Sequence, residues 1–437
     1  MGSIQAIRGT RDILPEEVVY WQRVEATARQ ILQRAAYREI RTPIFEQTEL
    51  FERGIGEATD VVGKEMYTFT DRGDRSITLR PEFTAGIVRS LIEHKLYANG
   101  IQRLWAMGPV FRYERPQAGR QRQFHQLDVE ILGSSDPRAD VEVIAIATDL
   151  LQALGLQTLR LDLNSVGTLE DRQNYRTALV DYFTPYQEDL DPDSQDRLTR
   201  NPLRILDSKD RRTQEIVKDA PSLLAYLCPD SQRRFEQVQQ LLTDVGIPFH
   251  INDRLVRGLD YYTHTAFEIQ SDDLGAQATV CGGGRYDGLV AQLGGPETPA
   301  IGWGLGMERL TILLQQLDQS VQETLDFYVV SRGDRAEAQA LQLAQVLRKL
   351  EFSVELDLTG SAFGKQFKRA DRSGAVACLI LGDEEAINRT AQLKWLASGE
   401  QVAIAQSDLP TMADSLRKQV AIARASSGND LYGATRS

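Results

Sequence analysis

At 437 residues, the chain has the length of two to four domains, each with room for a buried core. Hydrophobic residues make up 42% of it and charged residues 26%, which excludes an intrinsically disordered chain. With 50 Lys and Arg against 62 Asp and Glu, the formal net charge is -12. This excludes indiscriminate nucleic-acid binding, so any polyanion must meet a local basic patch.

The sequence carries no sign of a targeting segment or a membrane span. Its first residues lack an apolar stretch, Ala6 breaks the myristoylation pattern, and no run approaches the roughly 18 apolar residues of a span. Cys228, Cys281 and Cys378 lie far apart without a CxxC pair, which fits a reducing compartment. We therefore expect a cytoplasmic protein that does not contact a membrane.

The first half of the chain predicts a helix followed by strands. Apolar residues recur every three or four positions from Glu16 to Tyr37, the spacing of an amphipathic helix. A strand at residues 39–45 contains Pro43, which a sheet tolerates only at an edge, an end or a bulge, so this strand could form a subunit boundary. Closely spaced strands favour a largely antiparallel sheet. The further strands are expected at residues 66–69, 76–80, 102–106 and 124–131.

A helical insertion then interrupts the sheet. Residues 168–248 form helical runs rich in Asp, Arg and Gln, which indicates an inserted helical module. Strand patterns resume at residues 261–269 and continue through a glycine cluster at 282–284 and residues 300–314.

A separate domain is expected after a polar linker at residues 315–324. Strands and helices alternate from residue 327 to 381, which predicts an α/β domain with a mixed or parallel sheet. The last residues, 426–437, are small and polar and predict a disordered tail.

Several common chemistries are excluded by residue spacing. The four histidines lie far apart and match no metal-binding pattern. Glycines in Gly302–Gly306 recur at i, i+2 and i+4, whereas a dinucleotide fingerprint needs i, i+2 and i+5. The segment Gly360–Gln366 is one residue short of a phosphate-binding loop and ends in Gln. We therefore expect no protein metal site and no such loop.

Two other segments point to ATP. Residues 112–122 place four arginines and one glutamate between two predicted strands, and guanidinium groups suit phosphate oxygens. Glycines at 302, 304 and 306 leave one strand face without side chains, so a flat ring can approach, and Arg309 follows at a helix start. The alternatives are a solvated arginine-rich turn for the first segment and tight packing, with Arg309 in a salt bridge, for the second.

These segments resemble known motifs. Phe111–Glu114 and Gly302–Arg309 look like motifs 2 and 3 of class II aminoacyl-tRNA synthetases, and the helix leading to Pro43 looks like motif 1. Arg257–Thr263 and Gly283–Asp287 are similar to the two signatures of histidyl-tRNA synthetases. The resemblance covers about residues 5 to 410. It also includes the segments Arg8–Pro15, Leu79–Thr84 and Asn201–Lys209.

The resemblance implies an α/β (α+β) fold: a class II antiparallel sheet flanked by helices, a helical insertion and a C-terminal α/β anticodon-binding domain. It implies a homodimer that activates L-histidine with ATP and transfers it to tRNA(His). The expected domains are a catalytic domain at 1–167 and 249–318, the insertion at 168–248, the anticodon-binding domain at 326–424 and the tail at 426–437.

Site residues carried over from the family fall into three groups. Arg112, Arg257 and Arg309 would be catalytic, and ATP, accompanied by Mg2+, would be bound by Arg112, Glu114, Arg120 and Arg309. The resemblance places these residues at the histidine: Glu82, Thr84, Arg112, Gln126, Glu130, Arg257, Tyr261, Tyr262 and Tyr286. It places these at the tRNA: Arg115, Gln117, Lys365, Lys368 and Arg369.

Within the histidine group, Glu82 and Thr84 would take the substrate ammonium. A carboxylate such as Glu130, together with a tyrosine hydroxyl, can satisfy both edges of an imidazole, and apolar amino acids would leave these groups unpaired. The alternatives are a salt bridge to Asp260 for Arg257 and an ordinary strand-end carboxylate for Glu130.

Other readings of the whole chain remain open. One is a non-catalytic paralogue similar to the regulatory subunit of ATP phosphoribosyltransferase, and another is a synthetase for threonine, proline or glycine. The cationic residues at 365–369 could be only a solvated helix face. Phe83 and Trp303 place bulky rings where many family members have other residues, which leaves the shape of the pocket open.

Overall fold

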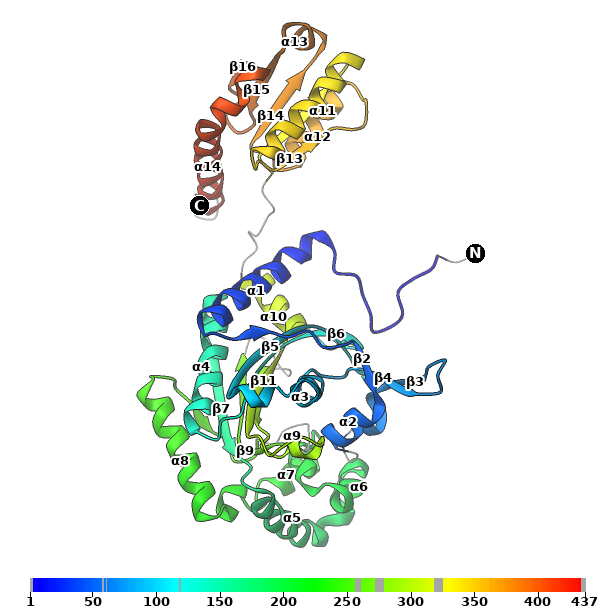
Figure 1. Ribbon diagram of the computed structural model, residues 1–437, viewed down its shortest axis with the longest axis vertical. Coiled ribbons are helices and arrows are strands. Elements are labelled where there is room, and N and C mark those ends of the chain that lie inside the picture. The colour runs from blue at the N-terminus through cyan, green and yellow to red at the C-terminus, as the bar shows by residue number, and fades with distance from the viewer. Residues whose placement is uncertain are drawn as a thin grey trace. The chain divides into compact units, whose positions relative to one another are not determined.

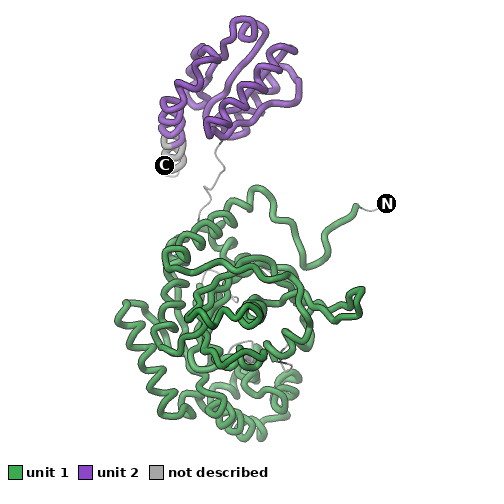
Figure 2. The backbone as a smooth tube through the Cα atoms, viewed as in Figure 1, with its two compact units in different colours: residues 1–321 green, residues 322–437 purple. Residues whose placement is uncertain are grey.

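The computed structural model describes residues 3–56, 59, 61–117, 119–255, 261–271, 279–317 and 325–433. The chain divides into two compact units, residues 1–321 and 322–437 (Figure 2). In the part of the chain that the structure describes, no helix has the length and apolar character to cross a membrane.

An eight-stranded sheet forms the centre of the first unit, in the order β1-β5-β6-β11-β10-β9-β7-β8. All its inner pairs are antiparallel, and only the outermost pairs, β1 with β5 and β7 with β8, are parallel. This confirms the antiparallel sheet expected from the sequence. The strands are β1 Arg38–Glu39, β5 Gln102–Phe111, β6 Gln123–Leu132, β7 Leu159–Ser165, β8 His250–Ile251, β9 Thr263–Ser271, β10 Thr279–Arg285 and β11 Ala300–Gly306.

Helices cover both faces of this sheet. One face shares a continuous apolar core with α1 Pro15–Arg34, α4 Pro137–Ala153, α8 Pro229–Asp244 and α10 Met307–Leu317. The sheet curves around α3 Thr84–Glu93 on its other side (Figure 1). Helix α1 ends earlier than the expected Tyr37 because Ala36 adopts a left-handed conformation, with φ 62°, which closes the helix.

The strand expected at residues 39–45 is wrong as a single element. The chain leaves the large sheet after β1 and enters a three-stranded sheet, ordered β2-β4-β3, at Phe45. Pro43 lies at the break, where a missing N–H costs no ladder hydrogen bond. The elements of this region are β2 Phe45–Gln47, α2 Thr48–Ile55, β3 Tyr67–Thr70 and β4 Ser76–Leu79.

Residues 168–248 are helical, as expected, and pack on the sheet within the first unit. Thr168 and Asp171 form a capping box at the start of α5. Asp171 also accepts hydrogen bonds from the Cys228 amide at 2.8 Å and the Ser231 hydroxyl at 2.6 Å, which ties α5 to α8. The helices are α5 Leu169–Phe183, α6 Pro192–Arg200, α7 Arg211–Val217 and α8.

The second unit is an α/β domain with a mixed five-stranded sheet, in the order β13-β12-β14-β15-β16. Its helix α14 runs to Gly433 and therefore covers residues 426–433, where the sequence predicts disorder. The helix continues because no proline interrupts it beyond its first turn and because each added residue gains a backbone hydrogen bond. The elements are β12 Phe327–Ser331, α11 Asp334–Lys349, β13 Val354–Leu356, α12 Phe363–Arg372, β14 Ala377–Leu381, α13 Asp383–Asn388, β15 Thr390–Trp395, β16 Gln401–Ala405 and α14 Leu409–Gly433.

A buried ion pair joins α4 to the end of β10. Arg285 and Asp140 are both fully buried and lie 2.5 Å apart, from Nη2 to Oδ2. Arg285 also contacts Asp287 at 3.0 Å, and Arg234 of α8 reaches the same Asp140 carboxylate at 3.1 Å. Removing Arg285 would leave the buried Asp140 carboxylate with Arg234 as its remaining cationic partner, so its charge would be only partly compensated.

Arg285→Met should therefore lower the free energy of unfolding by about 3–5 kcal/mol, measured by urea denaturation. Arg138→Met is the matched control, since its pair with Asp136 is exposed and should contribute little. Equal losses in the two variants would contradict a structural role for the buried pair.

Candidate active site

Three polar side chains on β6 face a row of glycines. Gln126, Asp128 and Glu130 alternate along the strand and therefore lie on the same face. In the antiparallel register they stand opposite Gly306, Gly304 and Gly302 of β11, respectively. A Cβ on Gly302 would lie only 1.6 Å from Oε2 of Glu130, so the carboxyl group occupies the space that the glycine leaves.

Two adjoining cavities lie above these strands. An inner cavity of about 170 Å³ is lined by Glu82, Thr84, Asp128 and Glu130 among others. An outer cavity of about 320 Å³ contains Glu114, Arg120, Glu268 and Arg309 in its lining. The residues that line both are Arg112, Gln126, Gly282 and Gly304. The two cavities therefore meet at one arginine and one glutamine.

The structure brings the expected site residues into these two groups. Every described member of the expected histidine set lines the inner cavity: Glu82, Thr84, Arg112, Gln126, Glu130, Tyr261, Tyr262 and Tyr286. The four expected ATP residues line the outer cavity: Arg112, Glu114, Arg120 and Arg309. Arg257 and Asp260 fall outside the described residues.

Glu130 lies within β6 rather than at a strand end and is only 1% exposed. It accepts hydrogen bonds from two hydroxyls, Thr84 at 2.7 Å and Tyr286 at 2.5 Å. Burial raises the pKa of Glu130 to about 8, and the nearby Glu82 carboxyl acts in the same direction. These surroundings therefore favour the neutral form of Glu130 near pH 7.

Glu82 caps the start of α3. Its two carboxylate oxygens accept hydrogen bonds from the backbone N–H groups of Thr84, at 2.6 Å, and Ala85, at 2.8 Å. Burial nonetheless raises its pKa, because the desolvation of the charged form outweighs these bonds. This cap fixes where α3 begins and so places the Thr84 hydroxyl beside Glu130.

The outer cavity holds several cationic groups. Arg112 is anchored by a hydrogen bond from Nε to the Pro81 carbonyl at 2.9 Å. Arg120 pairs with Glu114 at 2.7 Å. Arg309 donates a hydrogen bond from Nη1 to the Thr279 carbonyl, at 2.7 Å, in place of the salt bridge that the sequence left open. Burial, and then the charge of Arg120, lower the pKa of Arg309. The arrangement suits an anion with several charges.

The rings of Phe83 and Trp303 are turned into the core. Trp303 donates from its indole nitrogen to the Val143 carbonyl of α4, at 2.8 Å, on the sheet face opposite the glycines. Phe83 is 1% exposed and lies under the Arg80 guanidinium, 4.1 Å from its ring centre. These bulky residues therefore leave the cavity open, which settles the doubt raised by the sequence.

Asp128 lines the inner cavity but was not identified from the sequence. The signal was present, because a strand alternates with period two and Asp128 lies between the identified residues Gln126 and Glu130. Glu268 of β9 was also missed, since nothing in the sequence places β9 beside the motif 2 hairpin.

The expected tRNA contacts differ in their surroundings. Arg115 and Gln117 are exposed in the β5–β6 hairpin, and Lys365 and Lys368 are exposed on α12. Arg369, however, is held by Asp357, with Nε 2.8 Å from Oδ2. The cationic face expected on α12 is therefore mainly that of its two lysines.

Among the described residues, neither the cysteines nor a cluster of metal-ligating side chains forms a further site outside the two cavities. Cys281 and Cys378 are buried, and burial raises the pKa of Cys378 to about 12. Among the residues that the structure describes, no three His, Cys, Asp or Glu side chains are placed to hold a metal ion.

The curved antiparallel sheet, its glycine-lined cavities and the arginine at their junction define a class II aminoacyl-tRNA synthetase. The family model described as histidyl-tRNA synthetase matches residues 9–310, and an anticodon-binding domain model matches residues 326–416. The chain belongs to the histidyl-tRNA synthetase family.

Relatives agree over nearly the whole chain. Proteins named histidine–tRNA ligase from Gloeothece citriformis and Cyanothece sp. are each 72% identical, over 96% of this chain and 97% and 98% of theirs. The apo histidyl-tRNA synthetase of S. aureus has a TM-score of 0.77 and 39% identity, over 93% of this chain and 98% of that one. These matches favour the synthetase over the regulatory paralogue.

Glu130→Gln should change the pH dependence of stability. The folded pKa of Glu130, about 8, lies above the ordinary glutamate value of 4.5, so wild-type stability falls as pH rises through this window, whereas Gln carries no titrating proton. The variant should gain on the order of 2–4 kcal/mol relative to wild type between pH 5 and pH 8.5. Urea unfolding at several pH values measures this, and a pH-independent difference would contradict it.

Proposed function

We propose that the chain joins L-histidine to ATP across the junction of the two cavities, forming histidyl-adenylate and pyrophosphate, and then transfers histidine to the 3′ end of tRNA(His). The observation that carries this proposal is that an acid-rich inner cavity and an arginine-lined outer cavity share Arg112 and Gln126. A cationic amino acid and a polyphosphate can meet there.

Arg112 acts at the shared position. When the histidine carboxylate attacks the α-phosphorus, negative charge grows on the phosphate oxygens, and a fixed guanidinium stabilises the transition state. The Pro81 carbonyl anchors the Arg112 side chain before the substrates bind, at 2.9 Å. Arg257, by family resemblance, assists at the same phosphate. Arg309 meets the adenine and the terminal phosphate.

The imidazole of histidine binds at Glu130. A neutral imidazole has one donor and one acceptor, and the Glu130 carboxyl group with its two hydroxyl neighbours can match either protonation state. An apolar side chain of similar size would leave these buried groups unpaired, so the polar pocket discriminates without an editing domain. Glu82, Thr84, Tyr261 and Tyr262 line the same cavity, and by family resemblance Glu82 and Thr84 take the substrate ammonium.

Mg2+ enters with ATP. The outer cavity is lined by the carboxylates Glu114, Glu268 and Glu308, which supply the oxygen donors that Mg2+ prefers. The ion would offset phosphate charge where the arginines do not. Each carboxylate already has a partner: Glu308 accepts the His125 amide at 2.9 and 3.0 Å, Glu114 pairs with Arg120, and Glu268 accepts the Thr279 hydroxyl at 2.9 Å.

Arg112→Gln should reduce histidine-dependent exchange of pyrophosphate into ATP by about 100- to 1000-fold, since it removes a fixed charge from the reacting phosphate. Arg138→Gln, on the exposed end of α4, is the matched control and should exchange like wild type. Absence of exchange in the wild-type protein would contradict the proposed function itself.

The tRNA is proposed to meet three parts of the chain. Arg115 and Gln117 are exposed in the hairpin next to the outer cavity's Arg120, where the 3′ end must arrive. The module at 168–248 would cover the acceptor stem, and the domain at 326–424 would bind the anticodon through Lys365, Lys368 and Arg369. The free cysteines suit the reducing cytoplasm that we propose as its location.

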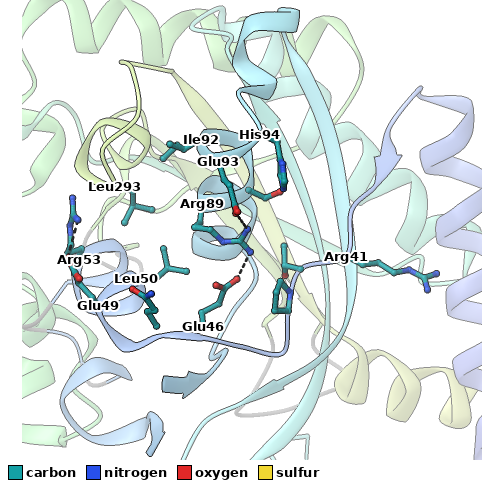
Figure 3. Close-up of a pocket in the computed structure, with 14 residues that line it drawn as sticks. Arg41, Glu46, Glu49, Leu50, Arg53, Arg89, Ile92, Glu93, His94 and Leu293 are labelled. Atoms are coloured by element: carbon teal, nitrogen blue, oxygen red, sulfur yellow. Dashed lines mark hydrogen bonds and ion pairs between the residues drawn. The ribbon is translucent and has the colours of Figure 1, made fainter. Parts of the chain in front are cut away.

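We further propose that the protein is a homodimer, joined through the segment around Pro43. A groove of about 760 Å³ lies there, with Pro43, Leu50 and Ile92 among its apolar lining residues (Figure 3). It also carries charges of both signs, including the Arg89 pair with Glu46 at 2.5 Å. A surface of mixed sign can be complementary to a second copy of itself. Beside the groove, Phe45 is 55% exposed on edge strand β2.

Phe45→Glu should raise the dimer dissociation constant by about 30-fold or more, because it places a charge where an aromatic side chain would be buried. Sedimentation equilibrium measures the change. Leu358→Glu is the control: Leu358 is 85% exposed in the second unit and should not affect association. A monomeric wild type would contradict the proposal.

A further inference from the structure

The inner cavity contains more acidic than basic groups. Glu82, Asp128 and Glu130 are each at most 3% exposed and all line it, while Arg112 is the one cation among its described lining residues. Burial raises the pKa of all three acids, as expected for carboxyl groups whose charge is not fully compensated. Such a cavity is built to receive a cation.

Two acceptors in this cavity are without partners. The oxygens of Glu82 accept backbone N–H groups, and those of Glu130 accept hydroxyls. Within the described residues, Oδ1 of Asp128 and Oε1 of Gln126 are buried and have no hydrogen-bond partner. A buried polar atom without a partner costs free energy, and such atoms persist where a ligand supplies the missing donor.

The position of these acceptors along β6 indicates which donor fits. Glu130 marks the imidazole end, and Gln126 marks the end shared with the outer cavity. Asp128 lies between them, about 7 Å along the strand from each, given ~3.4 Å per residue. In histidine, the α-ammonium and the reacting carboxylate are both bonded to Cα, one methylene away from the imidazole, so an acceptor between the two ends of the cavity can reach the ammonium. An ammonium has three N–H donors and no acceptor.

We propose that Asp128 binds the α-ammonium of the amino-acid substrate, together with the Gln126 side-chain oxygen. This inference rests on the proposed function and deepens it, because it adds a residue to the recognition of histidine. Glu82 and Thr84 line the same cavity, but the Glu82 side chain also caps α3 and the Thr84 hydroxyl donates to Glu130. In contrast, Oδ1 of Asp128 has no hydrogen-bond partner among the described residues and can accept a hydrogen bond from the ligand.

The test compares ligands with and without the ammonium group. Asp128→Asn removes the charge with little change in shape. In pyrophosphate exchange it should raise KM for histidine by about 10- to 100-fold while KM for ATP stays within about 3-fold, because Asp128 does not line the outer cavity. In calorimetric titration, the variant should lose affinity for histidinol by a similar factor but keep its affinity for imidazolepropionate, which lacks the ammonium.

Two further variants keep the outcome unambiguous. Asp171→Asn is the matched control: it also alters a buried, hydrogen-bonded aspartate, but Asp171 lies in the insertion and lines neither cavity. Asp128→Ala, at a position whose register partners Ala106 and Gly304 are small, replaces Asp128→Asn if that variant unfolds. Equal weakening of histidinol and imidazolepropionate, or none, would overturn the role of Asp128. Absence of exchange in the wild type would instead contradict the proposed function.

Discussion

The pairing register between β6 and β11 is the constraint on which the site depends. It sets Gln126, Asp128 and Glu130 opposite three glycines, so that side chains on one strand use space left empty by the other. A shift of β11 by one residue would turn Trp303 toward the cavity and remove the glycines from their places opposite the three polar groups of β6. Trp303 opposes such a shift, because its ring is buried on the other face and its N–H is bonded to α4.

Burial then sets the pKa values of the acidic groups on β6 and the kind of ligand that they can bind. The same low-dielectric surroundings that raise the pKa of Glu130 and Asp128 make the inner cavity receptive to a cation. In the adjoining outer cavity, Arg112 and Arg309 are each held by a backbone carbonyl, which makes this cavity receptive to phosphates. The two cavities meet at Arg112, as the proposed joining of a carboxylate to a phosphorus requires, and this joining needs no nucleophilic side chain.

Helix caps and ion pairs hold the walls of the site in place. Glu82 starts α3 at the residue whose hydroxyl meets Glu130, and Asp171 joins the two ends of the helical insertion. The buried Arg285 and Asp140 pair fixes the strand end that precedes Tyr286. Charged residues, which a sequence alone would place on the surface, therefore hold helices and a strand end in place inside this protein.

The sequence alone determined the antiparallel sheet, the inserted helices and the α/β second unit, because strand alternation and helical spacing are local properties of the chain. Most residues expected in the two cavities came instead from the resemblance of short motifs to a known family. It could not show that residues 39–45 split between two sheets, that Arg369 is engaged by Asp357, or that Glu82 caps a helix. Nor did it single out Asp128, whose meaning depends on the glycine opposite it. These features depend on contacts between segments tens to hundreds of residues apart or on the local path of the backbone, and only the folded chain fixes which groups gain partners and which are left for a ligand.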